Sequence, residues 1–159
     1  MIAKLIVEGE EFDIEILDPN IQKLIAPKKK TGYERVKYYD DFFANYHNST
    51  TSYTDKRMNF SNQCYDCADY YSDKTVAENN NRADALMRKL RRFAVEHRTK
   101  DDPTEKYYIN YVKQVGLQIM RSDDKYIGPW FDTLHNASVA IETFRDELTW
   151  YFTEYEDSL

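Results

Sequence analysis

The start of the chain alternates hydrophobic and polar residues with a period of two. In residues 5–17, LIVEGEEFDIEIL, the second half places an acidic residue between successive hydrophobic ones, and Gly9 supplies a turn. This period is typical of half-buried strands, so the pattern predicts an N-terminal hairpin. Asp18 and the proline after it then fit the start of a short helix over residues 19–26, which the proline at position 27 ends.

An aromatic-rich region, residues 32–66, follows a lysine-rich connection. Its composition predicts three strands, at residues 34–39, 42–47 and 52–60, with the polar stretch 48–52 as a hairpin loop. The hydrophobic period changes after residue 75, so we expect these strands to lead into a helix.

A long helix is predicted from about residue 76 to residue 98. Thr75 and Glu78 fit a capping box, which marks the start of the helix. Hydrophobic residues recur at helical spacing on its inner side, namely Val76, Ala83, Leu86, Leu90, Phe93 and His97. Because of this position, His97 is interpreted as a core histidine and not as a catalytic base.

The second half of the chain repeats this order of elements. Strands are predicted at residues 106–112 and 117–121, around a turn that ends at Gly116, and residues 126–131 read as an edge segment. A final helix is predicted from about 137 to 156. Its inner stripe consists of Ile141, Phe144, Leu148, Tyr151 and Tyr155.

Strands followed by a helix, twice, predict an α+β fold with two long amphipathic helices on one face of an antiparallel sheet. Pairing Leu86 with Phe144 also suggests a weak strand–strand–helix duplication, although amphipathic patterning alone would look similar. We expect one domain over residues 1–159. It would consist of the N-terminal hairpin and short helix (1–30), a first strand–helix unit (31–100) and a second one (101–159).

The composition is that of a globular, acidic protein. The chain has 159 residues, a formal net charge of −6 and fourteen tyrosines, whose rings supply apolar volume while their hydroxyls need partners. The charged N-terminal stretch does not resemble a signal peptide, and no apolar run approaches the roughly 20 residues that cross a bilayer. These features predict a cytoplasmic location.

One helix carries an excess of positive charge. Residues 79–100 hold seven Lys or Arg against two Asp or Glu, a local balance of +5, while the rest of the chain carries −11. Arg88, Arg91 and Arg92 lie opposite the apolar side of this helix, and Arg98 follows them. These arginines are either a solvated helix face or candidate contacts to nucleic acid phosphates.

The C-terminal helix carries a second candidate surface. Trp150 is expected opposite the Phe144 and Leu148 stripe, where acidic residues surround it. An outward-facing Trp with a charged rim has the composition of a binding hot spot, but the same Trp could equally pack inside the protein. The candidate partner-binding residues are Trp150, Asp146, Glu147, Glu154 and Glu156.

Cys64 and Cys67 have a CxxC spacing, which occurs in zinc sites and redox dithiols. A zinc site needs four ligands, and neither a second CxxC nor a paired histidine motif is present. The two cysteines also lie well before the predicted helix start, where no helix dipole would lower a thiol pKa. We therefore expect small buried hydrophobic residues, no metal and no cofactor.

No catalytic motif is recognisable in the sequence. It lacks a G-x-S-x-G elbow, a P-loop, a dinucleotide glycine fingerprint and an H-E-x-x-H pair. The acidic doublets at residues 40–41, 101–102 and 123–124 fit turns or strand ends better than magnesium sites. The protein is therefore predicted not to be an enzyme.

Two segments, SDKTVAENNNRADALMRKLRRFAVEHR (72–98) and AIETFRDELTWYFTEYEDSL (140–159), resemble small proteins of bacterial phages, prophages and related mobile elements. GYERV at residues 32–36 and the Tyr-rich strands extend this resemblance, while residues 40–68 depart from the usual pattern of that group. The shared motifs are structural, and none of them implies a catalytic residue.

The resemblance implies a function by setting. Small acidic phage proteins without an active site often bind a host protein, and inhibitors of CRISPR effector nucleases are one such class. The leading hypothesis is therefore a non-catalytic inhibitor of host antiphage defence, of the anti-CRISPR kind, that binds its target through the acidic C-terminal helix. The alternative is an accessory protein that binds nucleic acid through the basic helix 82–100.

Overall fold

The computed structural model describes residues 2–7, 10–15, 17–18, 30–46, 49–99, 103–122 and 128–155. Its internal contacts divide the chain into two compact units, Met1–Thr31 and Gly32–Leu159. The predicted short helix at residues 19–26 lies outside the described residues.

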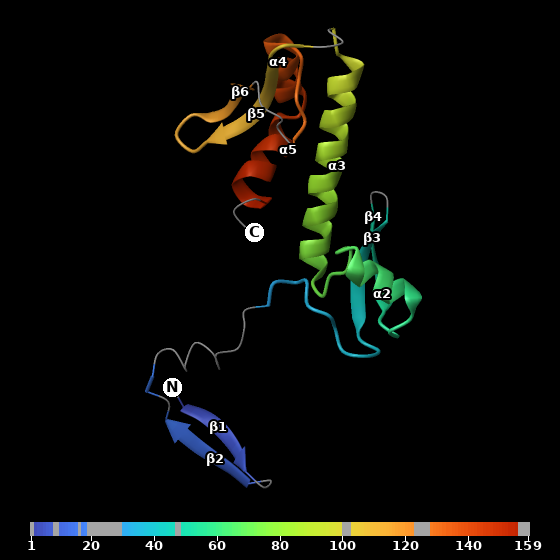
Figure 1. Ribbon diagram of the computed structural model, residues 1–159, viewed down its shortest axis with the longest axis vertical. Helices are drawn as coiled ribbons and strands as arrows, with labels where there is room; N and C mark the ends of the chain where they lie inside the picture. Colours follow the sequence, from blue (N-terminus) through green and yellow to red (C-terminus); the bar gives the residue numbers. More distant parts are fainter. Residues whose placement is uncertain are drawn as a thin grey trace. The chain divides into compact units, whose positions relative to one another are not determined.

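The described elements are antiparallel hairpins and helices (Figure 1). In chain order they are β1 (Ile2–Val7), β2 (Glu10–Glu15), β3 (Asp41–Tyr46), β4 (Ser49–Thr54), α2 (Asn59–Asp66), α3 (Lys74–Glu96), β5 (Lys106–Val112), β6 (Gly116–Ser122), α4 (Leu134–Thr143), α5 (Arg145–Trp150) and the π-helical turn η1 (Tyr151–Tyr155).

The α+β class is confirmed, but the predicted common sheet is wrong for the described residues. Each hairpin forms its own two-stranded sheet: β1 with β2, β3 with β4, and β5 with β6. Among the described residues, β3 and β5 each form one further isolated bridge, Phe43 with Tyr71 and Tyr107 with Phe131. A single bridged residue does not extend into a third strand, so the helices pack on separate hairpins.

The N-terminal hairpin is confirmed as predicted. β1 and β2 pair in antiparallel register from Ile2 opposite Glu15 to Val7 opposite Glu10. The alternating apolar and acidic residues of β2 therefore form a strand, as their period of two predicts.

On both sides of β3 the chain differs from the prediction. Residues 34–39 do not form a strand, since Asp40 N donates to Lys37 O in a turn and Tyr39 has a φ of 70°. The predicted hairpin loop at 48–52 is wrong, because β4 already begins at Ser49 and pairs with β3. The predicted strand at 52–60 ends at Thr54, and α2 follows it after Arg57, whose φ is 54°. Left-handed backbone at these two residues breaks the extended pattern that their composition favours.

The helix α3 is confirmed, although its cap differs from the predicted one. The N-cap is Asp73, whose carboxylate accepts hydrogen bonds from Thr75 N at 2.8 Å and Val76 N at 3.1 Å. Glu78 pairs instead with Lys74, one turn earlier on the exposed face. Of the predicted inner stripe, Ala83, Leu86 and Leu90 are buried, whereas His97 is exposed at the end of the helix.

In the second half, the strands are confirmed and the helix is interrupted. β5 and β6 pair as predicted, with Gly116 at a φ of 89° where β6 begins. The predicted helix 137–156 begins earlier, at Leu134, and breaks at Phe144, whose φ and ψ are −116° and 22°. α5 and η1 continue beyond the break, and Leu148 and Tyr151 pack on the same cluster as Phe144.

The two halves of the larger unit share a local geometry. Phe43 in β3 and Tyr107 in β5 each exchange two backbone hydrogen bonds with an aromatic residue, Tyr71 and Phe131 respectively. In both cases a helix begins three residues after that aromatic residue. Superposing Tyr71 on Phe131 relates residues 60 positions apart, whereas the predicted pairing of Leu86 with Phe144 relates residues 58 positions apart. The duplication of one unit therefore stays a prediction.

Two hydrophobic clusters form the core of the larger unit. The first half is built on Phe42, Ala44 and Tyr70. The second half is built on a larger set: Leu86, Leu90, Ala94, Ile109, Phe131, Ala137, Ala140 and Leu148. The C-terminal part of α3 thus belongs to the second cluster, while its N-terminal part contacts β3 and β4. None of the helices in the described part of the chain is long and apolar enough to cross a membrane.

Candidate functional site

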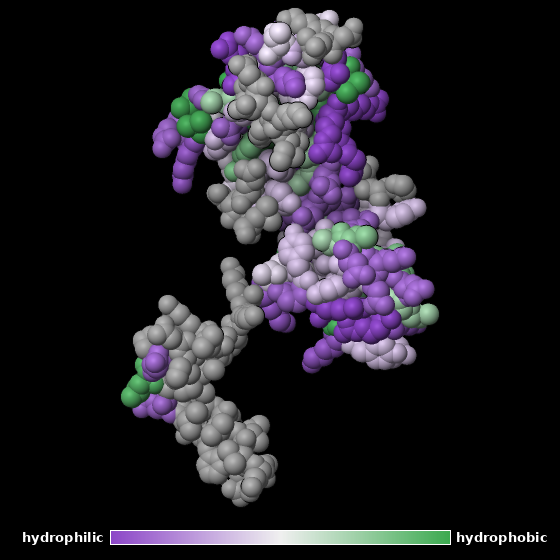
Figure 2. Space-filling view, viewed as in Figure 1, coloured by the Kyte–Doolittle hydropathy of each residue, from purple (hydrophilic) through white to green (hydrophobic). Residues whose placement is uncertain are grey.

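The basic residues of α3 form an exposed surface. Arg88, Arg91 and Arg92 are exposed, as is Arg98 just after the helix. The space-filling view shows a hydrophilic strip along this part of α3 (Figure 2). The predicted orientation of the arginines, opposite Leu86 and its buried neighbours, is therefore confirmed.

The structure divides these four arginines among three environments. Arg92 pairs with Glu96, one turn further along the helix, at 2.6 Å. Arg88 lines a polar cavity beside the turn that follows α2. Arg91 and Arg98 line a groove at the C-terminal end of α3, together with Trp130.

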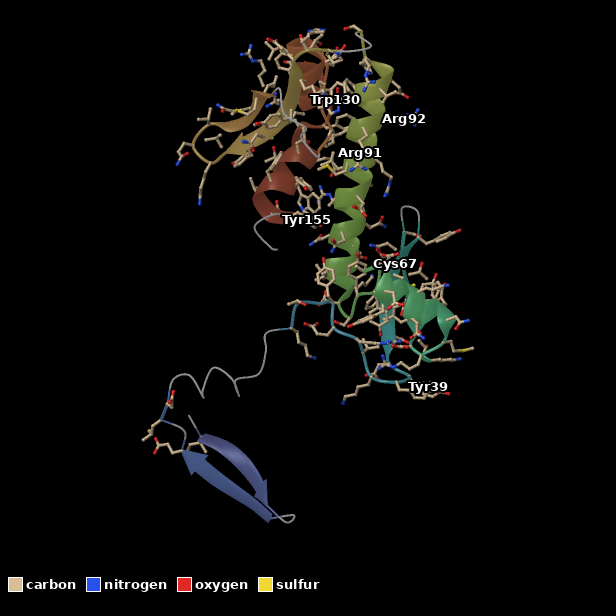
Figure 3. The ribbon with its side chains drawn as sticks, in the orientation of Figure 1. Tyr39, Cys67, Arg91, Arg92, Trp130 and Tyr155 are labelled. Carbon is tan, nitrogen blue, oxygen red and sulfur yellow. The ribbon has the colours of Figure 1, made fainter. Side chains whose placement is uncertain are left out.

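This groove, here called the Trp130 groove, has a volume of about 370 Å³. Its lining consists of Arg91, Ala94, Val95, Arg98, Gly128, Pro129 and Trp130. Figure 3 shows Trp130 beside the C-terminal turns of α3, with Arg91 on the neighbouring helix surface. The groove thus joins α3 to the segment that precedes α4.

Backbone pairing positions two of the groove's neighbours. Tyr107 and Phe131 form an antiparallel bridge, so Lys106 and Trp130, the residues before them, project from the same face. The ammonium of Lys106 lies 5.0 Å from the centroid of the Trp130 ring. The bridge that starts the α4 segment therefore also brings a cation to the indole.

A buried carboxylate positions Arg98. Asp132 is almost fully buried and accepts hydrogen bonds from Thr99 N at 2.6 Å and Thr99 Oγ1 at 2.7 Å. Asn136 donates both to His97 O and to Asp132 Oδ1, at 2.6 and 2.8 Å. These bonds hold the end of α3 beside Trp130, where the guanidinium of Arg98 stacks with its carbon 4.6 Å from the ring centroid.

The charge around the Trp130 groove is uncompensated by nearby carboxylates of the described residues. Within that part of the chain, no carboxylate lies within ion-pair distance of Arg91, Arg98 or Lys106. Other arginines of the protein, such as Arg82 and Arg121, do have such partners. Three cations beside an indole ring can bind an anion, and a planar group can stack on the Arg98 guanidinium.

The predicted partner-binding surface on the C-terminal helix is wrong for its central residue, Trp150, which is buried and not exposed. Trp150 is only 8% exposed, and its ring lies 3.8 Å below the guanidinium carbon of Arg82 and 5.6 Å from the Tyr155 ring. Trp150 still points away from Leu148, as helical spacing requires, but Arg82 of α3 and Tyr155 cover that side of the helix. Trp150→Asp would therefore destabilise the fold and would not test partner binding.

The acidic residues around Trp150 are not equivalent. Glu147 accepts a hydrogen bond from Arg82 Nε at 2.9 Å and so belongs to this internal contact. Asp146 and Glu154 are exposed, and Glu156 lies outside the described residues. The structure thus leaves Asp146 and Glu154 as exposed acids without the anchor that was predicted to lie between them.

The two cysteines lie on an element that the sequence did not predict. Cys64 is in α2, and Cys67 caps the end of that helix. Cys64 is half-buried, but Cys67 is exposed, so the expectation of two buried hydrophobic residues is wrong for Cys67. Both thiols are free, and burial raises the pKa of Cys64. The described residues contain no group of three or more His, Cys, Asp or Glu side chains placed to hold a metal.

Sequence reasoning missed Trp130, which lines the groove, and its supporting neighbours Lys106 and Asp132. The two cations nearest the Trp130 ring, Lys106 and Arg98, are more than twenty positions away along the chain. The bridge between Tyr107 and Phe131 and the hydrogen bonds of Asp132 bring them to this ring.

Comparison with known proteins yields no relative. No family model matches the chain, and neither the curated proteins nor the solved structures contain a match to it. What the Trp130 groove binds is therefore inferred from its own residues.

Proposed function

We propose that this protein acts without catalysis, as a binding protein that takes a single nucleic acid strand into the Trp130 groove. The observation that supports the proposal is the convergence of Arg91, Arg98 and Lys106 on Trp130 without a carboxylate partner among the described residues. This function is the alternative that the basic helix suggested. It now ranks first because Trp150 is buried.

The chemistry of the groove suits a single strand. Proteins that bind single strands combine cations that contact phosphates with aromatic or arginine planes on which bases stack. Arg98 is held against the Trp130 ring, so less side-chain freedom is lost when it contacts a ligand. The negative net charge of the chain opposes this binding only weakly, because charges beyond about 8 Å are screened at physiological salt.

A binding role is also consistent with the reactive groups of the described residues. The pKa of Cys64 is raised by burial, with the charge of Asp69 as the next cause, which is the reverse of what a nucleophilic thiol requires. The ring of His97 stacks on Phe93 at 3.9 Å, and its Nδ1 bonds to Phe93 O. Neither group is set up for covalent catalysis.

Fluorescence anisotropy with a labelled 15-nucleotide poly(dT) strand tests the proposal. Three cations that neutralise phosphates of a single strand give a slope of about −2 for log affinity against log salt concentration. Raising the salt from 50 to 200 mM should therefore weaken binding about 20-fold.

Substitutions in the groove should change this slope. The double variant Arg91→Ala/Arg98→Ala leaves one cation, so we expect a slope of about −0.7 and at least tenfold weaker binding at low salt. Arg92→Ala removes one guanidinium from the same helix but outside the groove, where Glu96 already pairs with it. Equal effects of the two variants, or no saturable binding by the unaltered protein, would contradict the proposal.

A protein partner is the second candidate, and a different surface favours it. Tyr38 and Tyr39 are exposed at a turn, with Tyr39 62% exposed and at a φ of 70°. A hydrogen bond from Tyr39 N to Asp55 O brings this turn beside the segment that carries exposed Met58. Exposed Tyr and Met side chains are enriched at protein interfaces.

In this reading the protein would be a phage or mobile-element inhibitor of host antiphage defence, with a CRISPR effector nuclease as one possible target class. Affinity purification from an infected host, after nuclease treatment, tests it by mass spectrometry. One stoichiometric protein that is retained by Arg91→Ala/Arg98→Ala but lost with Tyr39→Asp would support the protein partner. Partners that disappear after nuclease treatment would instead support the Trp130 groove.

A further inference from the structure

A second cavity lies nearer the N-terminus of α3, at the turn that follows α2. It has a volume of about 540 Å³, within the range of small-molecule sites. The residues Asn81, Asp84 and Arg88 line it from one face of α3, since they are three and four positions apart. Cys67 and Asp69 line it from the turn.

Tyr71 contributes a polar group to this cavity. Its side chain is only 6% exposed and packs on Tyr33, with the ring centroids 5.4 Å apart. Its hydroxyl has no hydrogen-bond partner among the described residues. Burial raises the pKa of Tyr71, and the charges of Asp69 and Asp84 raise it further. All three side chains line the same cavity.

The two carboxylates repel one another. Asp69 is half-buried and accepts one hydrogen bond, from Asn45 N at 3.1 Å. Its pKa is raised mainly by burial and also by the charge of Asp84. Within the described part of the chain, Asp84 itself has no ion pair. A cation between the two carboxylates would relieve this repulsion.

The charge and size of the cavity define the class of cation. Two carboxylates against Arg88 leave a net charge of −1 on the lining. A bare metal ion suits neither this volume nor two carboxylates, because hard divalent cations require six or more oxygen ligands. A primary ammonium has three N–H donors, one for each carboxylate and one for a phenol oxygen.

We propose that this cavity binds a small organic cation through a primary ammonium group, with Asp69, Asp84 and the hydroxyl of Tyr71 as its acceptors. The cation enters beside Cys67, whose side chain is exposed at the cavity lining. This site is separate from the Trp130 groove, and neither proposal depends on the other.

Isothermal titration calorimetry with 1,4-diaminobutane tests the proposal. We expect saturable binding, and none by the fully N-methylated diamine, which keeps the charge but has no N–H donor. Asp84→Asn should weaken binding about tenfold or more, because a hydrogen bond to a charged group is lost. Asp66→Asn is the matched control, since it removes an exposed carboxylate at the end of α2 that does not line the cavity.

Tyr71→Phe removes a single oxygen atom and should weaken binding about fivefold. A second readout uses Cys67 in a Cys64→Ser background, where bound diamine should slow alkylation of the thiol by iodoacetamide. The proposal is overturned if the diamine does not bind, if Asp84→Asn and Asp66→Asn have equal affinities, or if magnesium chloride is the only cation that binds.

Discussion

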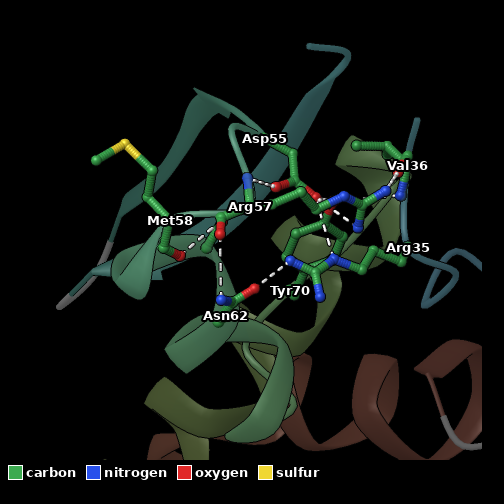
Figure 4. Close-up of polar contacts among 8 residues, drawn as sticks. Arg35, Val36, Asp55, Arg57, Met58, Asn62 and Tyr70 are labelled. Carbon is green, nitrogen blue, oxygen red and sulfur yellow. Dashed lines mark hydrogen bonds and ion pairs between the residues drawn. The ribbon is translucent and has the colours of Figure 1, made fainter. Parts of the chain in front are cut away.

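The two halves of the larger unit begin their helices in the same way but are stabilised by different interactions. In the first half, the segment before α3 is fixed by a buried charge: Asp55 is fully buried and bonds to Arg35, Arg57 and Tyr70 (Figure 4). In the second half, the corresponding region packs on a larger apolar cluster that includes Phe131 and Leu148, and its buried Asp132 accepts hydrogen bonds from uncharged donors of Thr99 and Asn136. One backbone arrangement can thus be supported mainly by a buried ion-pair network or mainly by hydrophobic contacts.

The difference lies in what each half can bury. The first half has only three buried hydrophobic residues in its cluster, so a carboxylate with several donors replaces apolar volume. Asp55 accepts from Arg57 N at 2.8 Å and from the Tyr70 hydroxyl at 2.8 Å, in addition to its two ion pairs. Such a group is stable only while every partner is present, because an unpaired buried charge is costly.

The largest effect should come from Asp55→Ala. Removing a buried charge from its partners typically costs about 3–5 kcal/mol, because Tyr70 and the guanidiniums lose their acceptor. We expect hydrogen exchange at the amides of Phe43 and Tyr71 to accelerate well before that at Tyr107 and Phe131. Exchange that accelerates equally in both halves would mean that the two halves unfold as one.

Leu148→Ala probes the apolar half. Leu148 is 1% exposed, and truncation of such a leucine costs about 2–4 kcal/mol through lost transfer energy and the cavity left behind. Chemical denaturation, followed by the fluorescence of Trp130 and Trp150, measures this loss. Ala140, also fully buried, offers a control in the same cluster as Ala140→Gly, which removes a single methyl group.

Acidification should destabilise the first half selectively. Burial opposes ionisation of Asp55, but hydrogen bonds from Arg57 N, Arg35, Tyr70 and Ser61 outweigh it and hold the pKa of Asp55 well below its usual range. The unfolded chain then binds a proton more readily than the folded one, so this contribution is complete at neutral pH. It decreases as the pH falls below the unfolded value of about 3.9.

Thermal unfolding at pH 7, 5 and 3 checks this expectation. The unaltered protein should lose more stability between pH 5 and pH 3 than Asp55→Asn, which has no carboxylate to protonate at this position. The effect is smaller than that of Asp55→Ala because a protonated carboxyl keeps part of its hydrogen bonding. Parallel curves for the two proteins would show that Asp55 does not control the acid limit.

The smallest expected effects concern the helix caps. Asp73 accepts two backbone hydrogen bonds at the start of α3 and also places a negative charge there, whereas Thr133 accepts one at the start of α4. Asp73→Ala should therefore cost about 1–2 kcal/mol and Thr133→Ala about 1 kcal/mol. Melting temperatures of the two variants rank the caps, and the reverse order would contradict the charge argument.

Prediction from sequence succeeded where a pattern is local. The register of the β5–β6 hairpin and the extent of α3 follow from alternation and helical spacing over a few residues. It failed for residues 52–60, whose composition favours a strand although Arg57 turns the chain into α2. Strand propensity describes a pleated and half-buried surface, and tertiary contacts such as the hydrogen bond from Arg57 N to Asp55 override it.

The candidate site was predicted only in part for the same reason. The exposure of Arg91 and Arg98 follows from helical geometry, since they lie opposite the buried stripe. The sequence does not show that Arg91 and Arg98 share a groove with Trp130, because Trp130 is distant in the chain. The ion pair of Arg92 with Glu96 could have been predicted, since the two residues are four positions apart on one helix. Trp150 was misplaced because helical spacing shows that it points away from Leu148 but not that Arg82 of α3 covers it.

The sequence by itself determined the first and last hairpins, the long basic helix and the α+β class, because each depends on contacts between near neighbours in the chain. Only the tertiary structure decided that Trp150 is buried against Arg82, that Asp55 joins Arg35 to Tyr70, and that Lys106 and Arg98 meet at Trp130. These contacts join residues tens of positions apart. No period or short motif encodes such contacts, because they form only when separate elements pack together.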